Sequence, residues 1–382
     1  MSVRKRKWLT RNGEAKEAWI VDYSVNGARH IETFERKKDA DAREAQVAVD
    51  VGKGIHIAPS KSPTVAQAGA RWLDGTDKLE AATVESYRQH LRDHIIPFIG
   101  DLRLGHISVP VVRNFMDKLK AEGRSPAMIK RLIGDLGSIL SDAQERGEVA
   151  HNAVRSLSKR RKKGAGQKRG QKLKIGVDIP APHEIKAIIA NLTGRWRPLL
   201  LTAIFTGLRS SELRGLRWAD VDLKKGVLHI RQRADKFNKI GAPKSESSER
   251  TIPLSPILAN TLREWKLICP KGEADLVFPN GAGQIENHAN IVQRGLAPVQ
   301  IAAGLITKAG EAKYTGLHAF RHFYASWCIN RREDGGLGLP IKLVQERMGH
   351  ASITMTSDRY GHLFDNGDDG SELKAAEKSL FS

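Results

Sequence analysis

The stretch RPLLLTAIFTGLRSSELRGLRW, residues 197–218, predicts the centre of the largest folded unit of this chain. Its first half is apolar on every side, which is typical of a helix buried within a core. Gly207 ends that helix, because glycine readily adopts the left-handed conformation of a helix C-cap. On the helix that follows, Arg209 and Glu212 lie three residues apart, so that the carboxylate can brace the guanidinium. We therefore expect residues 179–382 to form a mixed α+β domain around this pair of helices.

Two expected strands, residues 227–233 and 249–254, flank a polar loop in the same domain. Lys244 lies in this loop, just before the second strand. A lysine in a loop can bring its ammonium group to a phosphate oxygen. Taken alone, such a lysine is more often a solvated surface residue.

The segment LHAFRHFYASW, residues 317–327, predicts a further helix. His318 and Arg321 are three residues apart, so both side chains can face one site. His322 is expected to point elsewhere and to support the turn or the core.

The segment LVQERMGHASITMTSDRYGHL, residues 343–363, predicts two helices separated by Gly349. His350 lies just beyond the first helix, and Tyr360 follows ten residues later. A tyrosine is a poor nucleophile at neutral pH, since its ordinary pKa is about 10. Together, however, these segments supply cations for a phosphate, proton donors and acceptors, and a hydroxyl that could attack phosphorus.

Residues 1–57 read as a small module of their own. Trp19, Val21, Tyr23 and Val25 alternate as in a half-buried strand. Asn26-Gly27 then predicts a hairpin turn before the return strand ARHIETF, and a helix follows. The module is a hairpin, or a three-stranded sheet if KWLTR joins it. It either binds DNA through its sheet or acts as a small structural cap, and both interpretations remain open.

Residues 63–155, which follow the short linker APSKSP (58–63), predict a four-helix bundle. The clearest helix has Ser125 as N-cap, Pro126 as first residue and Gly147 as its stop. Its apolar residues form one continuous stripe: Ile129, Leu132, Ile133, Leu136, Ile139, Leu140 and Ala143. A second helix, TVESYRQHLRDHIIPFIG, is expected to end near Pro97.

The chain of 382 residues has 63 Lys and Arg against 43 Asp and Glu, a formal charge of +20 and a pI near 10.0. This predicts a polyanionic partner, most simply nucleic acid, although a merely soluble or ribosome-associated basic protein has the same signature. The linker 156–178 cannot bury a core. Its basic residues either contact DNA phosphates or form a generic basic linker: Lys159, Arg160, Arg161, Lys162, Lys163, Lys168 and Arg169.

Several classes of protein are disfavoured. The two cysteines, Cys269 and Cys328, have no CxxC spacing, so neither a zinc site nor a disulfide framework is indicated. The N-terminus lacks the apolar stretch of a secretory signal, and no apolar run is long enough to span a membrane. We expect a cytoplasmic protein that works beside the nucleoid.

In this order, the segments resemble the active-site boxes of the tyrosine recombinases, the family of lambda-type phage integrases and Cre-like enzymes. The resemblance covers the catalytic domain and rests on TGLR-x-x-E, PKS before R-x-IPL, H-x-x-RH, GH and the terminal RY-GH. Residues 63–155 resemble the core-binding domain of that family, and residues 1–57 resemble, more weakly, the arm-type DNA-binding domain of the larger integrases. At Ala319 many members have an acidic residue, but this position is not catalytic.

The resemblance implies that Arg209 and Arg321 grip the non-bridging oxygens of a scissile DNA phosphate. Fixed guanidinium groups stabilise the negative charge of the transition state without reorganising. It further implies that His350 hydrogen-bonds the same phosphate and that Glu212 orients the first arginine.

The resemblance also implies that Tyr360 is the nucleophile, which forms a 3′-phosphotyrosine and frees a 5′-hydroxyl. His318 would be the acid–base partner of Tyr360, and Lys244 the general acid for the leaving oxygen. Neither ATP nor a metal cofactor is implied. Histidines could in principle be metal ligands, but the available carboxylate, Glu212, is expected to pair with arginine.

The implied function is site-specific recombination that integrates or excises a phage or mobile element. The implied partners are double-stranded DNA at core and arm sites, three further copies in a homotetramer on synapsed DNA, a bending protein like integration host factor, and an excisionase. The tail GSELKAAEKSLFS (370–382) is helix-prone and either docks on a neighbouring copy or frays.

Two other functions remain as alternatives. A type IB-like topoisomerase would share the chemistry, but the N-terminal module disfavours it. A DNA-binding regulator with a decayed site is disfavoured because all six catalytic positions are filled.

Overall fold

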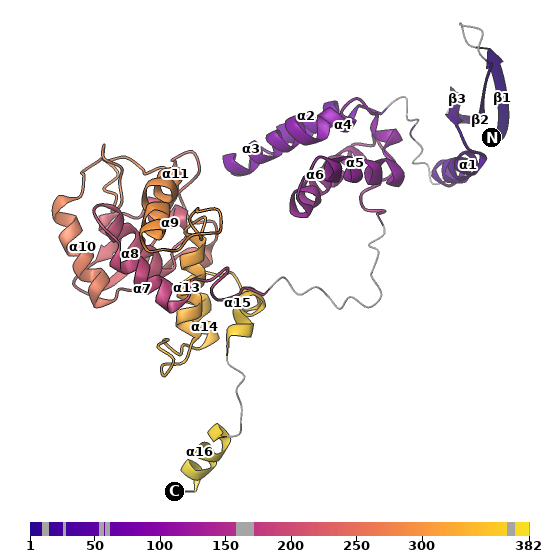
Figure 1. Cartoon of the computed structure of the whole chain (residues 1–382). Helices are drawn as coiled ribbons and strands as arrows, with labels where there is room; N and C mark the ends of the chain where they lie inside the picture. The colour runs from indigo at the N-terminus through magenta and orange to yellow at the C-terminus, as the bar shows by residue number, and fades with distance from the viewer. Residues whose placement is uncertain are drawn as a thin grey trace. The chain divides into compact units, whose positions relative to one another are not determined.

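The computed structural model describes residues 1–9, 15–25, 28–52, 57, 62–157, 172–364 and 371–381, and Figure 1 shows its elements. The chain divides into two compact units, Met1–Lys162 and Lys163–Ser382. The Asn26-Gly27 turn, residues 58–61 and the basic linker residues from Lys159 to Arg169 lie outside the described residues. Within the described ranges, no helix has both the length and the apolar character needed to cross a membrane.

The N-terminal module is a three-stranded antiparallel sheet packed on one helix. The strands are β1 (Ser2–Leu9), β2 (Ala15–Val25) and β3 (Ala28–Phe34), in spatial order β1-β2-β3, and the helix is α1 (Lys37–Gly52). The predicted alternation in β2 is confirmed, since Val21 and Tyr23 are buried against Ala40 and Val47 of α1. The described part of KWLTR does join the sheet, because Lys7, Trp8 and Leu9 are part of β1.

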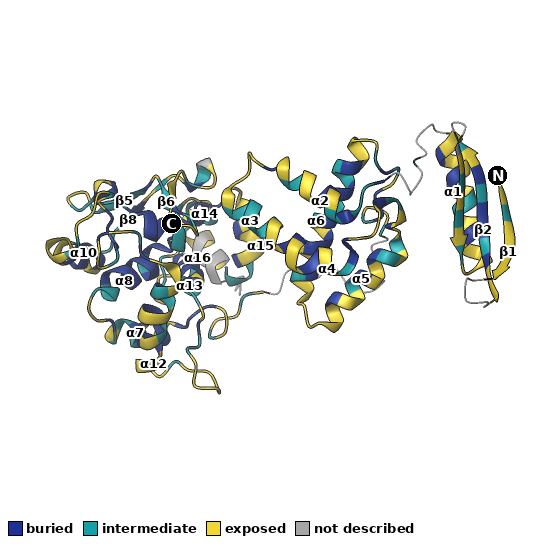
Figure 2. Ribbon diagram, turned by 90° about the horizontal axis from the view of Figure 1, so that it is seen from above, coloured by how far each residue is buried: buried dark blue, intermediate teal, exposed yellow. Residues whose placement is uncertain are grey.

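Helices around one core form the rest of the first unit (Figure 2). They are α2 (Val65–Asp74), α3 (Ala81–His90), the π-helix η2 (Leu91–Ile95), α4 (Ile96–Ile99), the short 3₁₀-helix η3 (Leu104–His106), α5 (Val109–Ala121) and α6 (Pro126–Glu145). The predicted apolar stripe of α6 is buried along its whole length. Ser125 caps α6, its hydroxyl accepting a hydrogen bond from the Met128 amide at 3.2 Å, so the predicted start is confirmed.

The expected helix end near Pro97 is confirmed, since the helical stretch ends at Ile99. Helical structure continues through Pro97 to Ile99, because the turn before it is a π-helix. Proline cannot donate a backbone hydrogen bond, and a π-turn lets the chain accommodate that loss without breaking the helix. The same arrangement recurs before Pro298, where the π-helix η6 (Ile291–Leu296) leads into α12 (Ala297–Ala302).

The second unit is built around α8 (Trp196–Thr206), which is buried on nearly every side as its sequence predicts (Figure 2). Small sheets lie beside it: β4 (Val221–Asp222), β5 (Val227–Ile230) and β8 (Arg250–Pro253) form one, and β6 (Arg233–Ala234) with β7 (Ile240–Gly241) forms the other. The expected strand 227–233 is therefore divided between β5 and β6. The remaining helices of this unit are α7 (Pro182–Ala190), α9 (Ser210–Gly215), α10 (Pro256–Ile268), α11 (His288–Asn290), α13 (His318–Ile329), α14 (Ile341–Met348), α15 (Ile353–Tyr360) and α16 (Ser371–Leu380), with the 3₁₀-helices η4 (Trp218–Asp220), η5 (Glu246–Ser248) and η7 (Gly361–Leu363).

The predicted fold class, mainly α with a small β-containing N-terminal module and a mixed catalytic unit, is confirmed. The second unit has two adjoining cores. One surrounds α8, and the other lies under α13, α14 and α15 and contains Tyr360.

Replacing a core residue of α6 should destabilise the helical bundle. Leu132 is fully buried, whereas Lys130 is exposed on the same helix. Leu132→Ala should cost about 2–5 kcal/mol of unfolding free energy, because it removes buried methyl groups and leaves a cavity. Urea denaturation of the full-length chain followed by circular dichroism measures the change. Lys130→Ala is the matched control, and equal midpoints for the two variants would contradict the placement of Leu132.

Candidate active site

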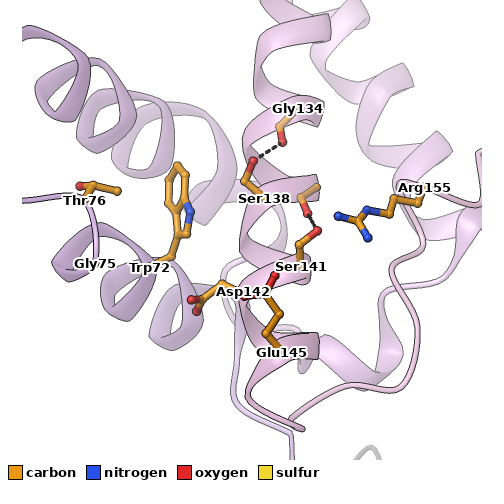
Figure 3. A pocket seen from close by; sticks show the side chains of 10 residues that line it. Trp72, Gly75, Thr76, Gly134, Ser138, Ser141, Asp142, Glu145 and Arg155 are labelled. Carbon is orange, nitrogen blue, oxygen red and sulfur yellow. Dashed lines mark hydrogen bonds between the residues drawn. The ribbon is translucent and has the colours of Figure 1, made fainter. Parts of the chain in front are cut away.

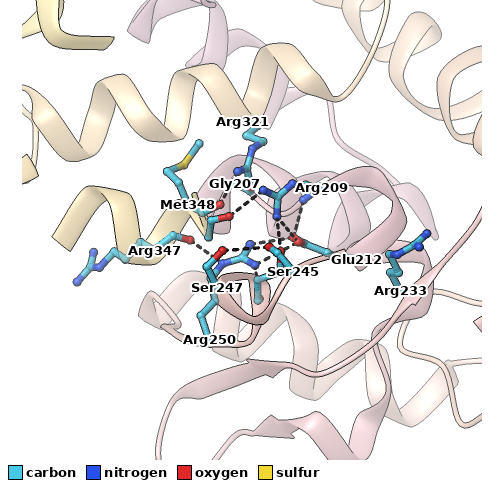
Figure 4. Close-up of polar contacts among 12 residues, drawn as sticks. Gly207, Arg209, Glu212, Arg233, Ser245, Ser247, Arg250, Arg321, Arg347 and Met348 are labelled. Carbon is cyan, nitrogen blue, oxygen red and sulfur yellow. Dashed lines mark hydrogen bonds and ion pairs between the residues drawn. The ribbon is translucent and has the colours of Figure 1, made fainter. Parts of the chain in front are cut away.

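Three successive backbone carbonyls at the C-terminal end of α14 each accept a hydrogen bond from a different arginine (Figure 4). The pairs are Arg250 with the Arg347 carbonyl at 2.8 Å, Arg321 with the Met348 carbonyl, and Arg209 with the Gly349 carbonyl at 2.8 Å. The last carbonyls of a helix have no partner within the helix and form the negative end of its dipole. They therefore fix guanidinium groups without neutralising their charge.

Glu212 is the carboxylate at the centre of this cluster. It is 2% exposed and accepts two hydrogen bonds from Arg250, at 2.8 and 3.1 Å, and one from the Arg209 guanidinium at 2.7 Å. It also accepts the backbone amide of Arg209 at 2.9 Å, as the predicted brace requires. Burial alone raises the pKa of Glu212, but the charge and hydrogen bonds of Arg250 and the charge of Arg209 outweigh it and lower the pKa to about 2.

Arg250 is a member of the cluster that the sequence analysis did not single out. Its side chain is 5% exposed, and besides Glu212 and the helix end it donates to the Ser248 carbonyl at 2.8 Å. A signal for it exists in the sequence, because Arg250 and the buried Ile252 are two residues apart on β8 and so share the face of the strand that points into the core. A charged residue at a core-facing strand position needs a buried partner.

Arg321, on α13, is 3% exposed and is held from two sides. Besides Met348, it donates to the Gly207 carbonyl at 2.6 Å. Gly207 has φ +60°, and a Cβ there would lie 2.5 Å from a ring carbon of Tyr324, so no other residue fits this turn without strain. Burial and the charge of Arg209 lower the pKa of Arg321 to about 9, which leaves it cationic at neutral pH.

Tyr360 is the last residue of α15 and is 1% exposed. Its hydroxyl lies 2.7 Å from Nδ1 of His322. Burial raises the pKa of Tyr360 to about 12, although the charges of Arg321 and Arg359 oppose the shift. The sequence analysis expected His322 to point elsewhere; the structure corrects this, because residues four apart on α13 share a face and His322 reaches the hydroxyl.

The other two predicted histidines also lie at this site. His318 meets His322 edge-on, with ring centroids 4.7 Å apart, and is itself exposed. His350 is buried, stacks on the Tyr360 ring at 6.2 Å between centroids, and places Nδ1 2.9 Å from the Thr356 hydroxyl. Among the described residues, Tyr360 is thus hydrogen-bonded to His322 rather than to His318.

All three imidazoles favour their neutral form. Burial first, then the charge of His318, lowers the pKa of His322 to about 3. Burial and the charges of Arg321 and Arg209 lower the pKa of His350 to about 4. Loss of hydration and the charge of Arg321 also lower the pKa of His318.

Lys244 occupies the exposed loop between β7 and η5. The same loop is tied to the cluster through Ser248, whose hydroxyl lies 3.4 Å from the Arg209 guanidinium. The seven basic linker residues, Lys159 to Arg169, lie outside the described residues, so their predicted DNA contacts have no structural account.

A separate groove lies between α2 and α6 in the helical bundle (Figure 3). Its serines, Ser138 and Ser141, donate to the carbonyls of Gly134 and Gly137 one turn earlier in α6, so their hydroxyls are engaged by the helix. This groove therefore has no activated nucleophile. Across the described ranges, no group of three or more His, Cys, Asp or Glu side chains is placed to hold a metal ion.

The buried carboxylate of Glu212 should make stability depend on acid pH. Because its pKa is lowered in the folded state, its stabilisation is complete above its ordinary pKa of 4.5 and is lost as the pH falls towards 2. Glu212→Gln should therefore lower the unfolding free energy by roughly 3 kcal/mol at pH 7, and by progressively less below pH 4.5. Urea denaturation between pH 3 and pH 7, with the exposed Glu249→Gln as control, measures this. A wild-type and variant difference that stays constant over this range would contradict the assignment.

Comparisons with known proteins agree with this geometry. Residues 181–366 match the Phage integrase family, and residues 70–120 match the Phage integrase, N-terminal SAM-like domain. The chain is 26% identical over 355 residues to a protein named Tyrosine recombinase XerC-like from Caldanaerobacter subterraneus subsp. tengcongensis, covering 86% of each chain. It is 22% identical to the Prophage integrase IntR of Escherichia coli K12 over 321 residues, covering 76% of this chain and 74% of IntR.

Solved structures share the fold. A Tn1549 transposon integrase in complex with a circular intermediate DNA superposes with a TM-score of 0.66 at 18% identity, covering 83% of this chain and 100% of that one. A lambda integrase dimer bound to a COC' core site gives a TM-score of 0.59 at 16% identity over 95% of both chains. A lambda integrase tetramer bound to a Holliday junction gives 0.58 at 16% identity, over 91% of this chain and 96% of that one. The chain belongs to the phage integrase family of tyrosine recombinases, which are site-specific DNA recombinases.

Proposed function

We propose that this recombinase cuts and rejoins DNA with Tyr360 as its nucleophile, and that it integrates or excises a phage or mobile element. The Tyr360 oxygen forms a bond to phosphorus while the bond from phosphorus to the 5′-oxygen breaks. The products are a 3′-phosphotyrosine and a 5′-hydroxyl. A 5′-hydroxyl of a partner strand reverses the step, so the energy of the phosphodiester is kept in the covalent link and no ATP is consumed.

The arginine cluster carries this proposal. Arg209, Arg250 and Arg321 contribute three positive charges against the single carboxylate of Glu212, which leaves two in excess. Backbone carbonyls hold these guanidiniums but do not neutralise them, so the cluster favours an anion. A phosphodiester gains negative charge as it approaches its trigonal-bipyramidal transition state. Fixed donors stabilise that charge without reorganising.

We assign the remaining roles as follows. Arg209 and Arg321 bind the non-bridging oxygens, and His350 donates to the same phosphate. Glu212 orients Arg209. Lys244 protonates the leaving 5′-oxygen from its loop, and His318, as a neutral imidazole, accepts the phenol proton of Tyr360.

We assign the DNA contacts by domain. Residues 179–382 perform catalysis, residues 63–155 contact the core site, and the basic residues of the linker 156–178 contact DNA phosphates. Four copies assemble on two synapsed duplexes, and one related structure is of a lambda integrase tetramer bound to a Holliday junction. A bending protein like integration host factor and an excisionase control direction, and the protein acts at the nucleoid.

The nucleophile is tested with nicked attachment-site DNA in the presence of EDTA, analysed on denaturing gels. Wild type should form a covalent 3′ adduct and Tyr360→Phe should form none, because only the phenol oxygen can bond to phosphorus. Adduct formation in EDTA also shows that the reaction needs no divalent metal. An adduct that persists in Tyr360→Phe would move the nucleophile to another residue. No adduct with any candidate DNA would favour a DNA-binding regulator.

We also propose that the N-terminal module binds arm-type DNA through the sheet face opposite α1. Strand alternation places Arg4, Arg6 and Trp8 of β1 on that face, because Val3 packs towards α1. Arg4 shares Asp22 with Arg29, at 2.9 and 2.5 Å, so part of its charge is already compensated. We therefore test DNA binding by this face at Arg6.

Arg6→Ala should weaken binding to DNA from the ends of the element and reduce its salt dependence by about one phosphate contact. Lys7 lies on the opposite face of β1 and pairs with Glu17, so Lys7→Ala is the matched control. Fluorescence anisotropy at two salt concentrations measures both. An equal loss of affinity in the two variants would contradict binding through this face.

A further inference from the structure

His322 has contacts at both of its ring nitrogens. Nδ1 lies 2.7 Å from the Tyr360 hydroxyl, and Nε2 lies 3.4 Å from the Arg359 guanidinium. The ring is buried and is further held by the edge-on contact with His318. Both ends of the imidazole are thus fixed before any DNA is bound.

These two contacts determine which nitrogen bears the proton. A neutral imidazole has one N–H donor and one bare acceptor nitrogen, whereas a guanidinium only donates. If Arg359 donates to Nε2, then Nε2 is the bare nitrogen and the proton is on Nδ1. Nδ1–H then donates to the Tyr360 oxygen, and the proton of the phenol is not donated to His322.

We propose that His322 is a positioning residue for the reaction, which holds the Tyr360 oxygen by donating Nδ1–H to it, and that Arg359 fixes this tautomer. The proposal rests on the assignment of Tyr360 as the nucleophile. In this arrangement His322 cannot take the phenol proton, so the proton goes to another base, the role proposed above for His318. As the proton leaves, the oxygen gains negative charge, and a hydrogen bond donated by His322 becomes stronger.

The tautomer is measured directly in the free full-length protein. Nitrogen NMR of ¹⁵N-histidine-labelled protein at neutral pH distinguishes a protonated from a bare imidazole nitrogen, and His322 is assigned by the signals missing from His322→Asn. We expect Nδ1 protonated and Nε2 bare in wild type, with the Nε2–H form increasing in Arg359→Ala. A bare Nδ1 in wild type, or a tautomer that Arg359→Ala leaves unchanged, overturns the proposal. This readout does not depend on cleavage, so it is independent of the role of Tyr360.

Adduct formation on nicked DNA then tests the role in the reaction. An asparagine amide can take the place of Nδ1, whereas the longer glutamine places its amide nearer Nε2. His322→Asn should therefore react within about threefold of wild type, while His322→Gln and His322→Ala should be about 10- to 100-fold slower, as expected for a lost hydrogen bond to a developing charge.

Two results would contradict this role: His322→Asn as slow as His322→Gln, or all three variants as fast as wild type. In the second case the contact would be a resting arrangement that breaks before attack. If wild type itself forms no adduct, the proposed function fails, and the nitrogen spectrum still decides the tautomer.

Discussion

The active site depends on the hydrogen bonds between three arginines and the backbone carbonyls at the C-terminal end of α14. Like charges repel, and gathering three arginines in a buried space is costly unless something holds each of them. The carbonyls of Arg347, Met348 and Gly349 do this, because they are the free acceptors that every helix leaves at its end. Since those carbonyls are dipoles rather than charges, the guanidiniums keep their positive charge. The position of α14 therefore determines where an anion can bind.

The positive charges of the arginines also contribute to the lowered pKa values of the three histidines. Burial disfavours the charged form of His350, and the charges of Arg321 and Arg209 add to the effect, so its pKa falls to about 4. A bound phosphate would supply the negative charge that is missing from the cluster and would oppose these shifts. In the absence of DNA the site thus contains cationic arginines and neutral imidazoles.

Periodicity and glycine placement predicted much of this structure. They gave α8 with its stop at Gly207, the capped start of α6, and the alternation of β2. They also placed a helix end near Pro97, but they did not indicate the π-helix that precedes it. The site residues on loops and helix ends could be given roles only through the family resemblance, since the acceptors that bring them together are backbone atoms. The spacing did contain a signal for two residues whose roles were not predicted. Arg250 is a charged residue at a core-facing position of β8, and His322 is a second histidine on the same face of α13 as His318.

The burial of Tyr360 explains why its phenol would be unreactive in the absence of DNA. A phenol with its pKa raised to about 12 is almost entirely protonated at neutral pH, and the Tyr360 side chain is buried, with 1% of the residue exposed. It can be activated only where positive charge favours the phenolate, and Arg321 and Arg359 already oppose the effect of burial. In the proposed mechanism, the same arginine, Arg321, would therefore both bind the phosphate and lower the cost of ionising Tyr360. Coupling the two through one residue ties activation of Tyr360 to the geometry in which a phosphate is present to be attacked.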